Sequence, residues 1–592
     1  MTQSFPRPAV IAAAMALVFI APAACGPADQ NDERATARGA MSEAVFPHEA
    51  SDLPADPQVR YGVLENGMRY AIVENDTPTG TAALRLVFNV GSLAEDEDQR
   101  GLAHFIEHMT FNGTTHVPEG EMVPLLERYG LAFGPDTNAF TGREVVGYQL
   151  DLPSVEDQVL DVGLFLLRET ASEIVFDPDA IERERGVIMG EMRTRDTPVR
   201  RFFNAYYSFL YDDTVVAERD PIGVAEVIET AGPQRFQRYY DAYYTPERAM
   251  LVVAGDVDAD AVEARIREGF PIEVPGLSVS HVESFADWTQ PSDPAPDPDI
   301  GAVHATSDAR FGYFHDPDVF TILTVDVLSP GEPRPDTRAS RLDGLKRQLG
   351  DAILQRRLQS LINSGQSPLV QANVSFANEF DLADKAGILG VASPERWREG
   401  LAVMENELRR ALEHGFTQAE LDEQLANVRT RLRNAADQAD TRSSPELADA
   451  LWGAWLSDEV FVHPDYALSW FEEVEAEFTV AAVEAAFQEA WAAAPPHVFA
   501  ALNTQIENGQ AAVREAWRAA SAEPVSPPEE TADEPFAYTD FGAPGAVVSR
   551  DLVVDLGVTQ IGFENGVRLN VKPTDFEDGV VRVRADFGAG DL

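Results

Sequence analysis

The feature that most constrains the fold of this 592-residue chain is an internal repeat. Residues 64–70 read Leu-Glu-Asn-Gly-Met-Arg-Tyr, and residues 563–569 read Phe-Glu-Asn-Gly-Val-Arg-Leu. The likeness continues without a gap at a constant offset of 499 residues, as from Gly67 to Gly566. A segment that recurs at a fixed offset indicates a duplicated structural unit. Because the second copy has only begun where the given sequence stops at Leu592, we expect a third domain that is truncated here.

Strand and helix patterns alternate along most of the chain. Asn66-Gly67 between two apolar runs indicates a β-hairpin, and Asp177-Pro178 suits the N-cap and first position of a helix. The expected strands are residues 59–64, 68–73, 82–90 and 250–254. The expected helices are residues 101–111, 155–172, 178–193, 396–414 and 418–436. This mixture of strands and helices predicts an α+β fold.

Composition divides the chain into domains and linkers. A Pro/Asp-rich segment around residues 290–299 and a Pro/Glu/Ala-rich segment around residues 522–545 are typical of linkers. The predicted parts are a signal peptide (1–24), a flexible tether (25–57), a first domain (58–285), a linker (286–299), a second domain (300–520), a linker (521–548) and the start of a third domain (549–592).

The net charge of −53 limits the possible partners. An anionic surface of this size repels nucleic acid and anionic lipid, so we expect no nucleic-acid partner. The chain has a single cysteine, Cys25, and therefore no intrachain disulfide. Its stability must come from packed apolar cores, for which its 44% hydrophobic content is sufficient.

The N-terminus has the pattern of an export signal. Arg7 precedes an apolar run at residues 9–20, which is too short for a membrane anchor, and small residues follow up to Cys25. Cleavage before Cys25 with lipidation would make a bacterial lipoprotein and explain the position of the lone cysteine. Cleavage after Ala23 would leave a free periplasmic protein, and Pro22 departs from the usual lipoprotein pattern. Either way we expect an exported, periplasmic protein; the lipidated form would contact the membrane only through its N-terminal anchor.

The stretch His104-Phe-Ile-Glu107-His108 is the strongest candidate for chemistry. Residues four apart lie on one face of a helix, so His104 and His108 can bind one metal ion. Glu107 projects from nearly the same face and can take a proton from water beside the metal. A catalytic zinc site has three protein ligands, so one more ligand must come from elsewhere. The alternative is an ordinary helix with two surface histidines. A chance match to the motif is rare in a chain of this length.

The helix expected from Pro178 offers three carboxylates as the third ligand: Glu182, Glu184 and Glu191. Glu184 and Glu191 share a helical face with Ile181 and Ile188, whereas Glu182 lies off that face. Two unpaired carboxylates on an apolar face are costly unless a metal and its histidines compensate them. Gly186 and Gly190 would allow a neighbouring helix to approach closely. A solvated acidic helix is the competing interpretation in so acidic a chain.

These residues resemble a known family. His104-Phe-Ile-Glu107-His108 is the inverted zinc motif of the inverzincins. The surrounding residues 101–114 resemble the signature of the pitrilysin/insulinase peptidases, and residues 184–191 resemble their second signature. The resemblance implies that Glu191 is the third zinc ligand and Glu184 a supporting carboxylate. Glu191 follows His108 by 83 residues, a few more than is usual in much of the family.

The resemblance also implies an architecture. Family members have two halves that close like a clam shell on short or unfolded peptides, each half made of two similar α/β-roll domains. This chain would then contain one half and the start of a third domain. The segment with Asn138, Ala139 and Thr141 resembles the edge strand onto which substrate adds as a β-strand, although Asn138 can also be a simple turn residue. The second domain would be non-catalytic, and a second half or subunit would complete the chamber.

The functional prediction is a zinc-dependent endopeptidase with one Zn²⁺ per chain and peptides as substrates. His104, His108 and Glu191 are the expected metal ligands, and Glu107 is the expected general base. The alternative is a non-catalytic peptide-binding or scaffold subunit of a peptidase complex, which would have no use for Glu107.

Overall fold

The structure of the chain is a computed structural model. It describes residues 45–289, 295–304, 306–331, 334–528, 540, 542–574 and 581–588. The described residues divide into two compact units. The larger unit holds those up to residue 436 together with residues 443–528, and the smaller holds residues 437–442 and those from 540 onward. The predicted signal peptide and Cys25 lie outside the described residues.

The first sheet of the larger unit has six strands in the order β1-β2-β6-β3-β5-β4. The strands are β1 (Val59–Val63), β2 (Arg69–Glu74), β3 (Ala82–Phe88), β4 (Thr137–Thr141), β5 (Val146–Leu152) and β6 (Ala249–Gly255). β2 and β6 are parallel, and the other neighbours are antiparallel. The predicted hairpin is confirmed as β1 and β2. β4 lies at one edge of the sheet, so one side of its backbone has no strand beside it in the described structure.

Helices and a small second sheet accompany these strands. The helices are α2 (Leu102–Met109), α3 (Met122–Arg128), α4 (Asp157–Ser172), α5 (Pro178–Thr194), α6 (Pro198–Leu210), α7 (Ala225–Thr230), α8 (Pro233–Tyr243) and α9 (Ala259–Glu268). The small sheet pairs β7 (Phe270–Pro271) with β8 (His281–Val282). The three helices expected from the sequence in this region are confirmed as α2, α4 and α5.

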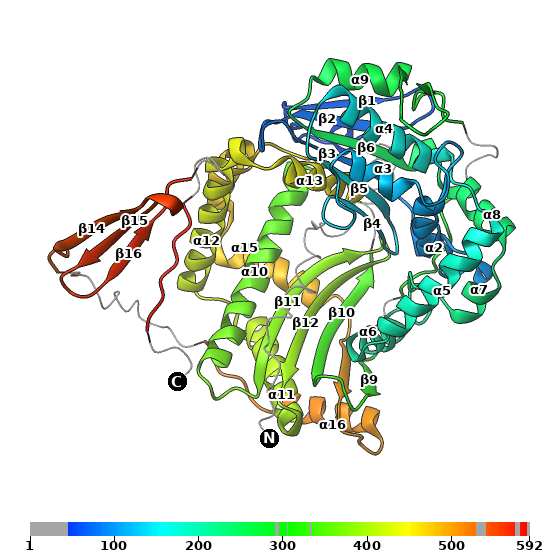
Figure 1. Cartoon of the computed structure of the whole chain (residues 1–592). Coiled ribbons are helices and arrows are strands. Elements are labelled where there is room, and N and C mark those ends of the chain that lie inside the picture. Colours follow the sequence, from blue (N-terminus) through cyan, green and yellow to red (C-terminus); the bar gives the residue numbers. More distant parts are fainter. Residues whose placement is uncertain are drawn as a thin grey trace, which may run out of the picture. The chain divides into compact units, whose positions relative to one another are not determined.

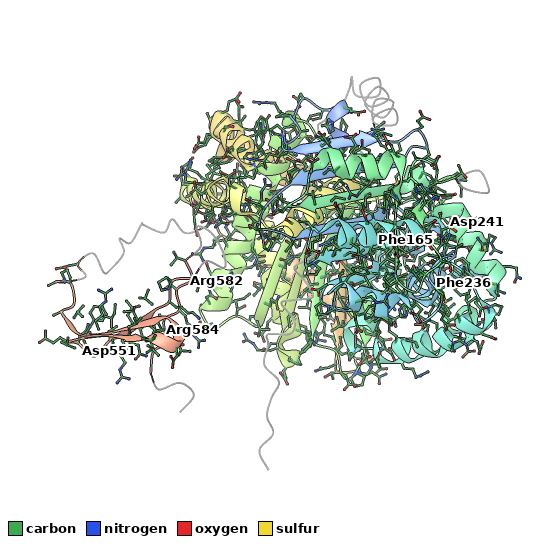
Figure 2. All side chains as sticks on the ribbon, turned by 45° about the horizontal axis from the view of Figure 1, so that its top comes forward. Phe165, Phe236, Asp241, Asp551, Arg582 and Arg584 are labelled. Atoms are coloured by element: carbon green, nitrogen blue, oxygen red, sulfur yellow. The ribbon has the colours of Figure 1, made fainter. Side chains whose placement is uncertain are left out.

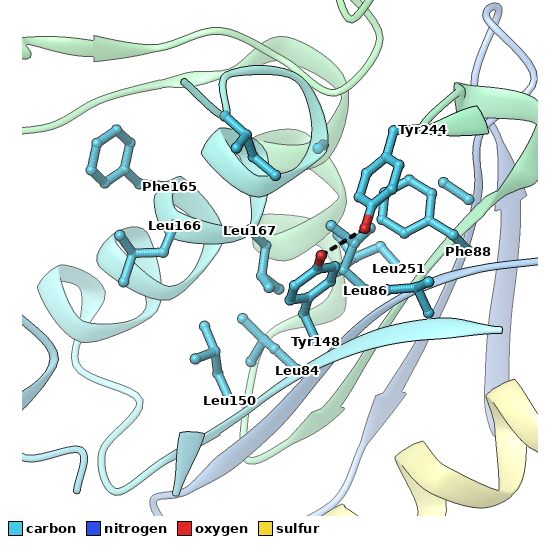
Figure 3. Close-up of a cluster of buried hydrophobic side chains, with 14 of the residues drawn as sticks. Leu84, Leu86, Phe88, Tyr148, Leu150, Phe165, Leu166, Leu167, Tyr244 and Leu251 are labelled. Carbon is cyan, nitrogen blue, oxygen red and sulfur yellow. Dashed lines mark hydrogen bonds between the residues drawn. The ribbon is translucent and has the colours of Figure 1, made fainter. Parts of the chain in front are cut away.

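The main core lies where α4 packs on β3 and β5. Figure 3 shows Leu166 and Leu167 of α4 above Leu84 and Tyr148 of the sheet. The hydroxyls of Tyr148 and Tyr244 share a hydrogen bond of 2.8 Å inside this cluster. Every residue of β3 is buried, which requires cover on both faces of the sheet.

The second face is covered by α13 (Ser444–Leu456), a helix from later in the chain (Figure 1). Leu447, Ala448 and Leu451 pack against the sheet in a cluster of buried apolar residues. Arg85 of β3 is 2% exposed, and its guanidinium binds Asp449 of α13 and Asp151 of β5, each at 2.7 Å. These pairs satisfy a buried charge at the contact between the first sheet and α13.

The second large sheet repeats the topology of the first. Its strands are β9 (Arg310–His315), β10 (Ile322–Pro330), β11 (Leu369–Glu379), β12 (Ala383–Ala392) and β13 (His497–Leu502). They run in the order β11-β12-β10-β13-β9, and only β13 and β9 are parallel. The strands β4-β5-β3-β6-β2 of the first sheet have the same order and the same relative directions. The predicted α+β fold, with two tandem similar domains, is therefore confirmed.

The helices around the second sheet are longer. They are α10 (Arg338–Asn363), α11 (Trp397–His414), α12 (Gln418–Asp437), α13, α14 (Pro464–Val474), α15 (Val480–Trp491) and α16 (Gly509–Ser521). Both helices expected from the sequence here are confirmed as α11 and α12. The predicted domain boundaries remain predictions, because the contacts within the larger unit do not separate its two sheets.

The smaller unit is a three-stranded antiparallel sheet of β14 (Val547–Val553), β15 (Val558–Phe563) and β16 (Arg568–Val571). Its side chains, Asp551 among them, stand on both faces of the sheet (Figure 2). The hairpin of β15 and β16 has the register of β1 and β2: Gly62 pairs with Tyr70, and Ile561 pairs with Leu569. The internal repeat thus corresponds to a repeated hairpin.

Two segments with the composition of linkers contain buried side chains. Phe46 and Leu53, within the predicted tether, are 4% and 3% exposed, and Trp288, within the predicted linker, is fully buried. Their apolar side chains outweigh the polar character of the segments around them. Among the described residues, no helix is both long enough and apolar enough to cross a membrane.

Candidate metal centre

Helix α2 carries the histidine motif, and its start is held by backbone and side-chain contacts. Gly101 precedes it at φ 98°, a conformation that favours glycine, and a Cβ there would lie 2.8 Å from Gly223. The buried carboxylate of Glu95 accepts hydrogen bonds from the backbone N–H groups of Gly101 at 2.9 Å and Ala103 at 2.8 Å. It therefore satisfies N–H groups that have no partner within the helix. Leu102, Phe105, Ile106 and Met109 bury the opposite face.

The side of α2 opposite these apolar residues carries the motif. His104, Glu107 and His108 have ligand atoms within 4.8 Å of one another, and they are the one such group found among the described residues. The two imidazole rings lie 4.8 Å apart between centroids. His104 is 4% exposed, whereas the side chain of His108 is 22% exposed. The sequence prediction that both imidazoles share one face of a helix is confirmed.

Helix α5 supplies the carboxylates. It begins as expected, because Asp177 accepts hydrogen bonds from the N–H groups of Asp179 and Ala180. Ile181 and Ile188 are buried, and Glu184 and Glu191 project from the same side of the helix. Glu182 lies elsewhere, highly exposed and paired with Arg185.

The expectation about the two glycines of α5 is wrong. A Cβ at Gly186 would meet nothing within 4 Å, and one at Gly190 only the end of the Arg193 side chain. The glycines therefore lie away from the contact with α2, which uses the face of the two isoleucines and two glutamates.

Three ligand-type atoms converge between the two helices. Oε2 of Glu191 lies 3.7 Å from Nε2 of His104 and 3.4 Å from Nε2 of His108. Nδ1 of His108 lies 2.7 Å from Oε1 of Glu184, so the second ring nitrogen of His108 is held by a carboxylate. Nδ1 of His104 is buried and has no hydrogen-bond partner among the described residues. The orientation of His108 is therefore set by a hydrogen bond, and that of His104 by packing.

Burial and neighbouring groups shift the pKa values of His104, His108 and Glu107. Burial, with His108 and Arg195 beside it, lowers the pKa of His104 to about 3. Burial also disfavours the charged form of His108, but the hydrogen bond to Glu184 and the nearby carboxylates outweigh it and raise its pKa. Burial raises the pKa of Glu107, which the hydrogen bond from Thr141 partly offsets. A neutral His104 keeps a lone pair free to bind a metal.

Strand β4 lies beside the same centre. Thr141 donates a hydrogen bond of 2.6 Å to Oε2 of Glu107, which ties the end of the edge strand to the motif. Asn138 is exposed and Ala139 partly buried, and both belong to β4 rather than to a turn. The three residues expected to bind substrate thus lie on one edge strand, and one of them contacts Glu107.

Three residues at the site were not found by sequence reasoning. Asn112 donates hydrogen bonds to the carbonyl of His108 and to Oε2 of Glu184, both at 3.0 Å. Arg195 binds Oε1 of Glu191 at 2.5 Å and leaves Oε2 facing the histidines. Glu95 caps the motif helix. A lone acid in a chain with 99 acidic residues has no sequence pattern that would single it out.

Comparison with known proteins identifies the family. A sequence model described as insulinase (peptidase family M16) matches residues 70–216, a range that includes all the residues of this centre. A second, described as the peptidase M16 inactive domain, matches residues 231–428. The chain belongs to the insulinase family of peptidases. The second match begins between α7 and α8, before β6 of the first large sheet, and ends within α12.

Several curated insulinase-family relatives are named as zinc proteases. The chain is 25% identical over 562 residues to a probable zinc protease PqqL of Escherichia coli, covering 92% of this chain and 57% of the relative. It is 35% identical over 225 residues to a probable zinc protease PqqL of Haemophilus influenzae, covering 38% of this chain and 24% of the relative. The chain thus spans little more than half the length of the E. coli relative.

Solved structures agree on the fold of this insulinase-family chain. The first half of the periplasmic protease PqqL from E. coli matches with a TM-score of 0.70 at 24% identity, covering 81% of this chain and 99% of that one. A second structure is described as the periplasmic protease PqqL from E. coli. It matches with a TM-score of 0.71 at 23% identity, covering 88% of this chain and 56% of that one. These likenesses identify the two-domain fold.

Proposed function

We propose that the chain is a zinc-dependent endopeptidase that hydrolyses short or unfolded peptides. One observation carries the proposal: Nε2 of His104, Nε2 of His108 and Oε2 of Glu191 converge beside the carboxylate of Glu107. Two imidazoles and one carboxylate are a donor set typical of catalytic zinc, whose fourth position is open to water or substrate. The family membership and the names of the relatives support the same activity.

The spacing of the donors fits zinc. With metal–ligand distances of about 2.0–2.2 Å in a tetrahedral site, ligand atoms lie roughly 3.3–3.5 Å apart. The separations from Glu191 to the two histidines are 3.4 and 3.7 Å, so only small movements are needed. When bound, zinc would acidify a coordinated water and polarise the scissile carbonyl. We assign His104, His108 and Glu191 as its ligands, one Zn²⁺ per chain.

Glu107 is the proposed general base. Its carboxylate takes a proton from the attacking water and delivers it to the nitrogen of the leaving amine. The hydroxyl of Thr141 binds Oε2 of Glu107, which holds the carboxylate in one orientation and leaves Oε1 for the water. Burial raises the pKa of Glu107, which makes it a better proton acceptor than an exposed glutamate.

Glu184 is proposed as a positioning residue. It accepts the N–H of His108 Nδ1, which leaves the lone pair of Nε2 for a metal. Asn112 holds the other oxygen of Glu184, so the carboxylate cannot rotate away. Carboxylates in this position typically contribute 10- to 100-fold to metal affinity or activity.

The edge strand β4 is proposed to bind the substrate. Its outer backbone groups can pair with an extended peptide, with Asn138, Ala139 and Thr141 as the contact residues. Only an extended segment can add to a strand edge, which favours short or unfolded peptides over folded proteins. A second half or a separate subunit is proposed to complete the substrate chamber.

We further propose that the chain is exported and acts in the periplasm, with Cys25 as a lipidation site. The N-terminal charge, apolar run and lone cysteine support this, although they lie outside the described residues. Labelling of cells that express the chain with a clickable fatty acid tests it. We expect label on the wild type and none on Cys25→Ser; equal labelling of both would contradict the anchor.

The activity is tested with a quenched fluorescent peptide of about ten unstructured residues and the zinc-loaded chain. We expect cleavage that a chelator stops and that zinc restores. Glu191→Gln should lose both bound zinc and peptide cleavage. Full zinc in this variant would mean that another residue is the third ligand. Peptide binding by the zinc-loaded wild type without any cleavage would instead favour a non-catalytic binding subunit.

A further inference from the structure

A cavity of about 460 Å³ lies in the larger unit, separate from the metal centre. It opens between the first described residues, the ends of β2 and β3, the turn before β6, and the C-terminal end of α13. None of its lining residues belongs to the metal cluster. Its lining includes Phe46, Arg69, Thr245, Arg248, Trp455 and Asp458. Its volume is within the range of small-molecule sites.

Two polar atoms on the cavity residues have no protein partner. The hydroxyl of Thr245 is fully buried, and Nε of Arg248 is buried, and neither has a hydrogen-bond partner among the described residues. Thr245 stands at the N-cap position of a 3-10 turn (Pro246–Arg248) without using its hydroxyl there. Buried polar groups in proteins are normally paired. A ligand with hydrogen-bonding groups would satisfy both atoms at once.

The charges around the cavity are also unmatched. Arg69 donates to the carbonyls of Val45 at 2.8 Å and Glu247 at 2.6 Å, and no carboxylate within ion-pair distance of it is found among the described residues. The carboxylate of Asp458 likewise has no hydrogen bond or ion pair there. Burial and the charge of Asp381 raise the pKa of Asp458 to about 6, although Arg69 opposes the shift.

Of the other charged groups, the carboxylate of Glu247 also has no ion pair among the described residues, whereas two pairs are complete. Arg248 binds Asp297 at 2.9 Å, and Asp336 binds Arg341 at 2.9 Å or closer. A simple anion would face Asp458 and Glu247, and a simple cation would face Arg69. A ligand that carries one group of each sign is free of both conflicts. The ring of Trp455, beneath the guanidinium of Arg69, and the side chain of Phe46 add an apolar wall.

We propose that this cavity binds a zwitterionic amino compound, an apolar α-amino acid or dipeptide. Its carboxylate would bind Arg69 and the free N–H of Arg248, and its ammonium group would bind Asp458. The hydroxyl of Thr245 would donate to the carboxylate, and the apolar side chain would lie against Phe46 and Trp455. This goes beyond the proposed peptidase activity and does not depend on it.

Calorimetric titration of the full chain with three probes tests the charge requirement. L-phenylalanine carries both charges, L-phenylalaninamide only the ammonium, and N-acetyl-L-phenylalanine only the carboxylate. We expect saturable binding of L-phenylalanine and at least tenfold weaker binding of the other two. Amino acids also chelate zinc, so the titration is repeated on His108→Ala, where we expect unchanged affinity. Loss of binding in that variant would place the ligand on the metal and overturn the proposal.

Two variants test the site itself. Thr245→Val removes the unpaired hydroxyl without breaking any protein hydrogen bond, and we expect affinity for L-phenylalanine to fall about three- to tenfold. Thr321→Val is the matched control, because the Thr321 hydroxyl is also buried without a partner but lies outside the cavity. Asp458→Asn should weaken binding at least tenfold, and asparagine tolerates the φ of 52° at this position.

The outcomes are separable. Weaker binding in Thr245→Val and Asp458→Asn, with Thr321→Val like the wild type, would support the site. Equal affinities in all four proteins, or no binding of any probe to the folded wild type, would overturn it. The latter would mean that ordered water fills the cavity and satisfies Thr245 and Arg248.

Discussion

The two large sheets of this protein have the same topology, yet only one lies beside a metal centre. In each domain a connection leads from the second strand of the repeat to the edge strand: from β3 to β4 in the first, and from β10 to β11 in the second. The first connection contains α2, with His104, Glu107 and His108. The second contains α10, which has no histidine. The shared fold thus determines where a helix lies, and the residues on that helix determine what it can do.

Helices α2 and α10 also differ in how their buried polar groups are paired. On α2 the buried polar group is His104, whose Nε2 faces Glu191 of another helix. On α10 it is Asp351, which accepts a hydrogen bond of 2.9 Å from the indole N–H of Trp491 and lies near Arg347. The buried carboxylate of α10 is thus paired within the second domain. The buried imidazole of α2 instead faces a point that a metal can occupy.

The largest expected difference between the domains is in zinc content. His108→Ala should lower bound zinc from about one per chain to none and abolish peptide cleavage, because two protein ligands rarely hold catalytic zinc. The matched control is His414→Ala at the exposed end of α11, which should retain zinc and activity. Elemental analysis of both purified variants measures the effect. Full zinc in His108→Ala would show that metal binding in the first domain does not depend on His108.

Glu107→Gln should separate metal binding from catalysis. We expect peptide cleavage to fall by roughly 10²- to 10⁴-fold, the usual contribution of a general base, with zinc retained. Asp351→Asn, at a buried carboxylate of α10, is the control and should leave cleavage unchanged. The initial rate with a quenched fluorescent peptide gives the result. A Glu107→Gln chain with full activity would remove the proposed base.

Glu184→Gln should have a smaller effect on the same centre. Loss of the carboxylate beside His108 should weaken zinc binding about 10- to 100-fold, since an amide holds the ring less firmly. Competition with a chromogenic chelator measures the affinity. Glu182→Gln, on the exposed face of α5, should bind zinc like the wild type. Equal affinities in the two variants would show that Glu184 has no positioning role.

The second domain should respond to pH instead. Burial raises the pKa of Asp351 to about 7 from an ordinary value of 3.8. Between these values the folded chain keeps a proton that the unfolded chain has lost, so the free energy of unfolding falls as pH rises from about 4 to 7. Asp351→Asn keeps an acceptor for Trp491 and cannot titrate. From pH 4 to 7 the free energy of unfolding of this variant should fall by on the order of 2 kcal/mol less than that of the wild type. Urea titrations at several pH values measure the difference. Parallel pH profiles would refute the shift.

Local features were predictable from the sequence because they depend on neighbouring residues. The two hairpins of the repeat share one register, and Gly67 and Gly566 have φ values of 89° and 88°. In each, the asparagine before the glycine accepts a hydrogen bond from the N–H two residues on. The spacing of His104 and His108 on a helix follows from the same kind of short-range geometry.

Other features were outside the reach of sequence patterns. Phe46 and Trp288 are buried in segments that their composition suggested were a tether and a linker. Glu95 holds the start of the motif helix and Arg195 binds Glu191, although nothing in the sequence around them marks them. Their roles depend on what distant segments place beside them.

Local sequence patterns were enough to predict the hairpins, the helices and the two halves of the candidate metal site, since each rests on contacts between residues a few positions apart. The packing of distant segments brings Oε2 of Glu191 to both histidines, makes β4 an edge strand, and places an unsatisfied Thr245 in the lining of a cavity. These depend on packing between segments far apart in the chain. Burial and the pairing of charges are properties of the whole fold, and no local pattern encodes them.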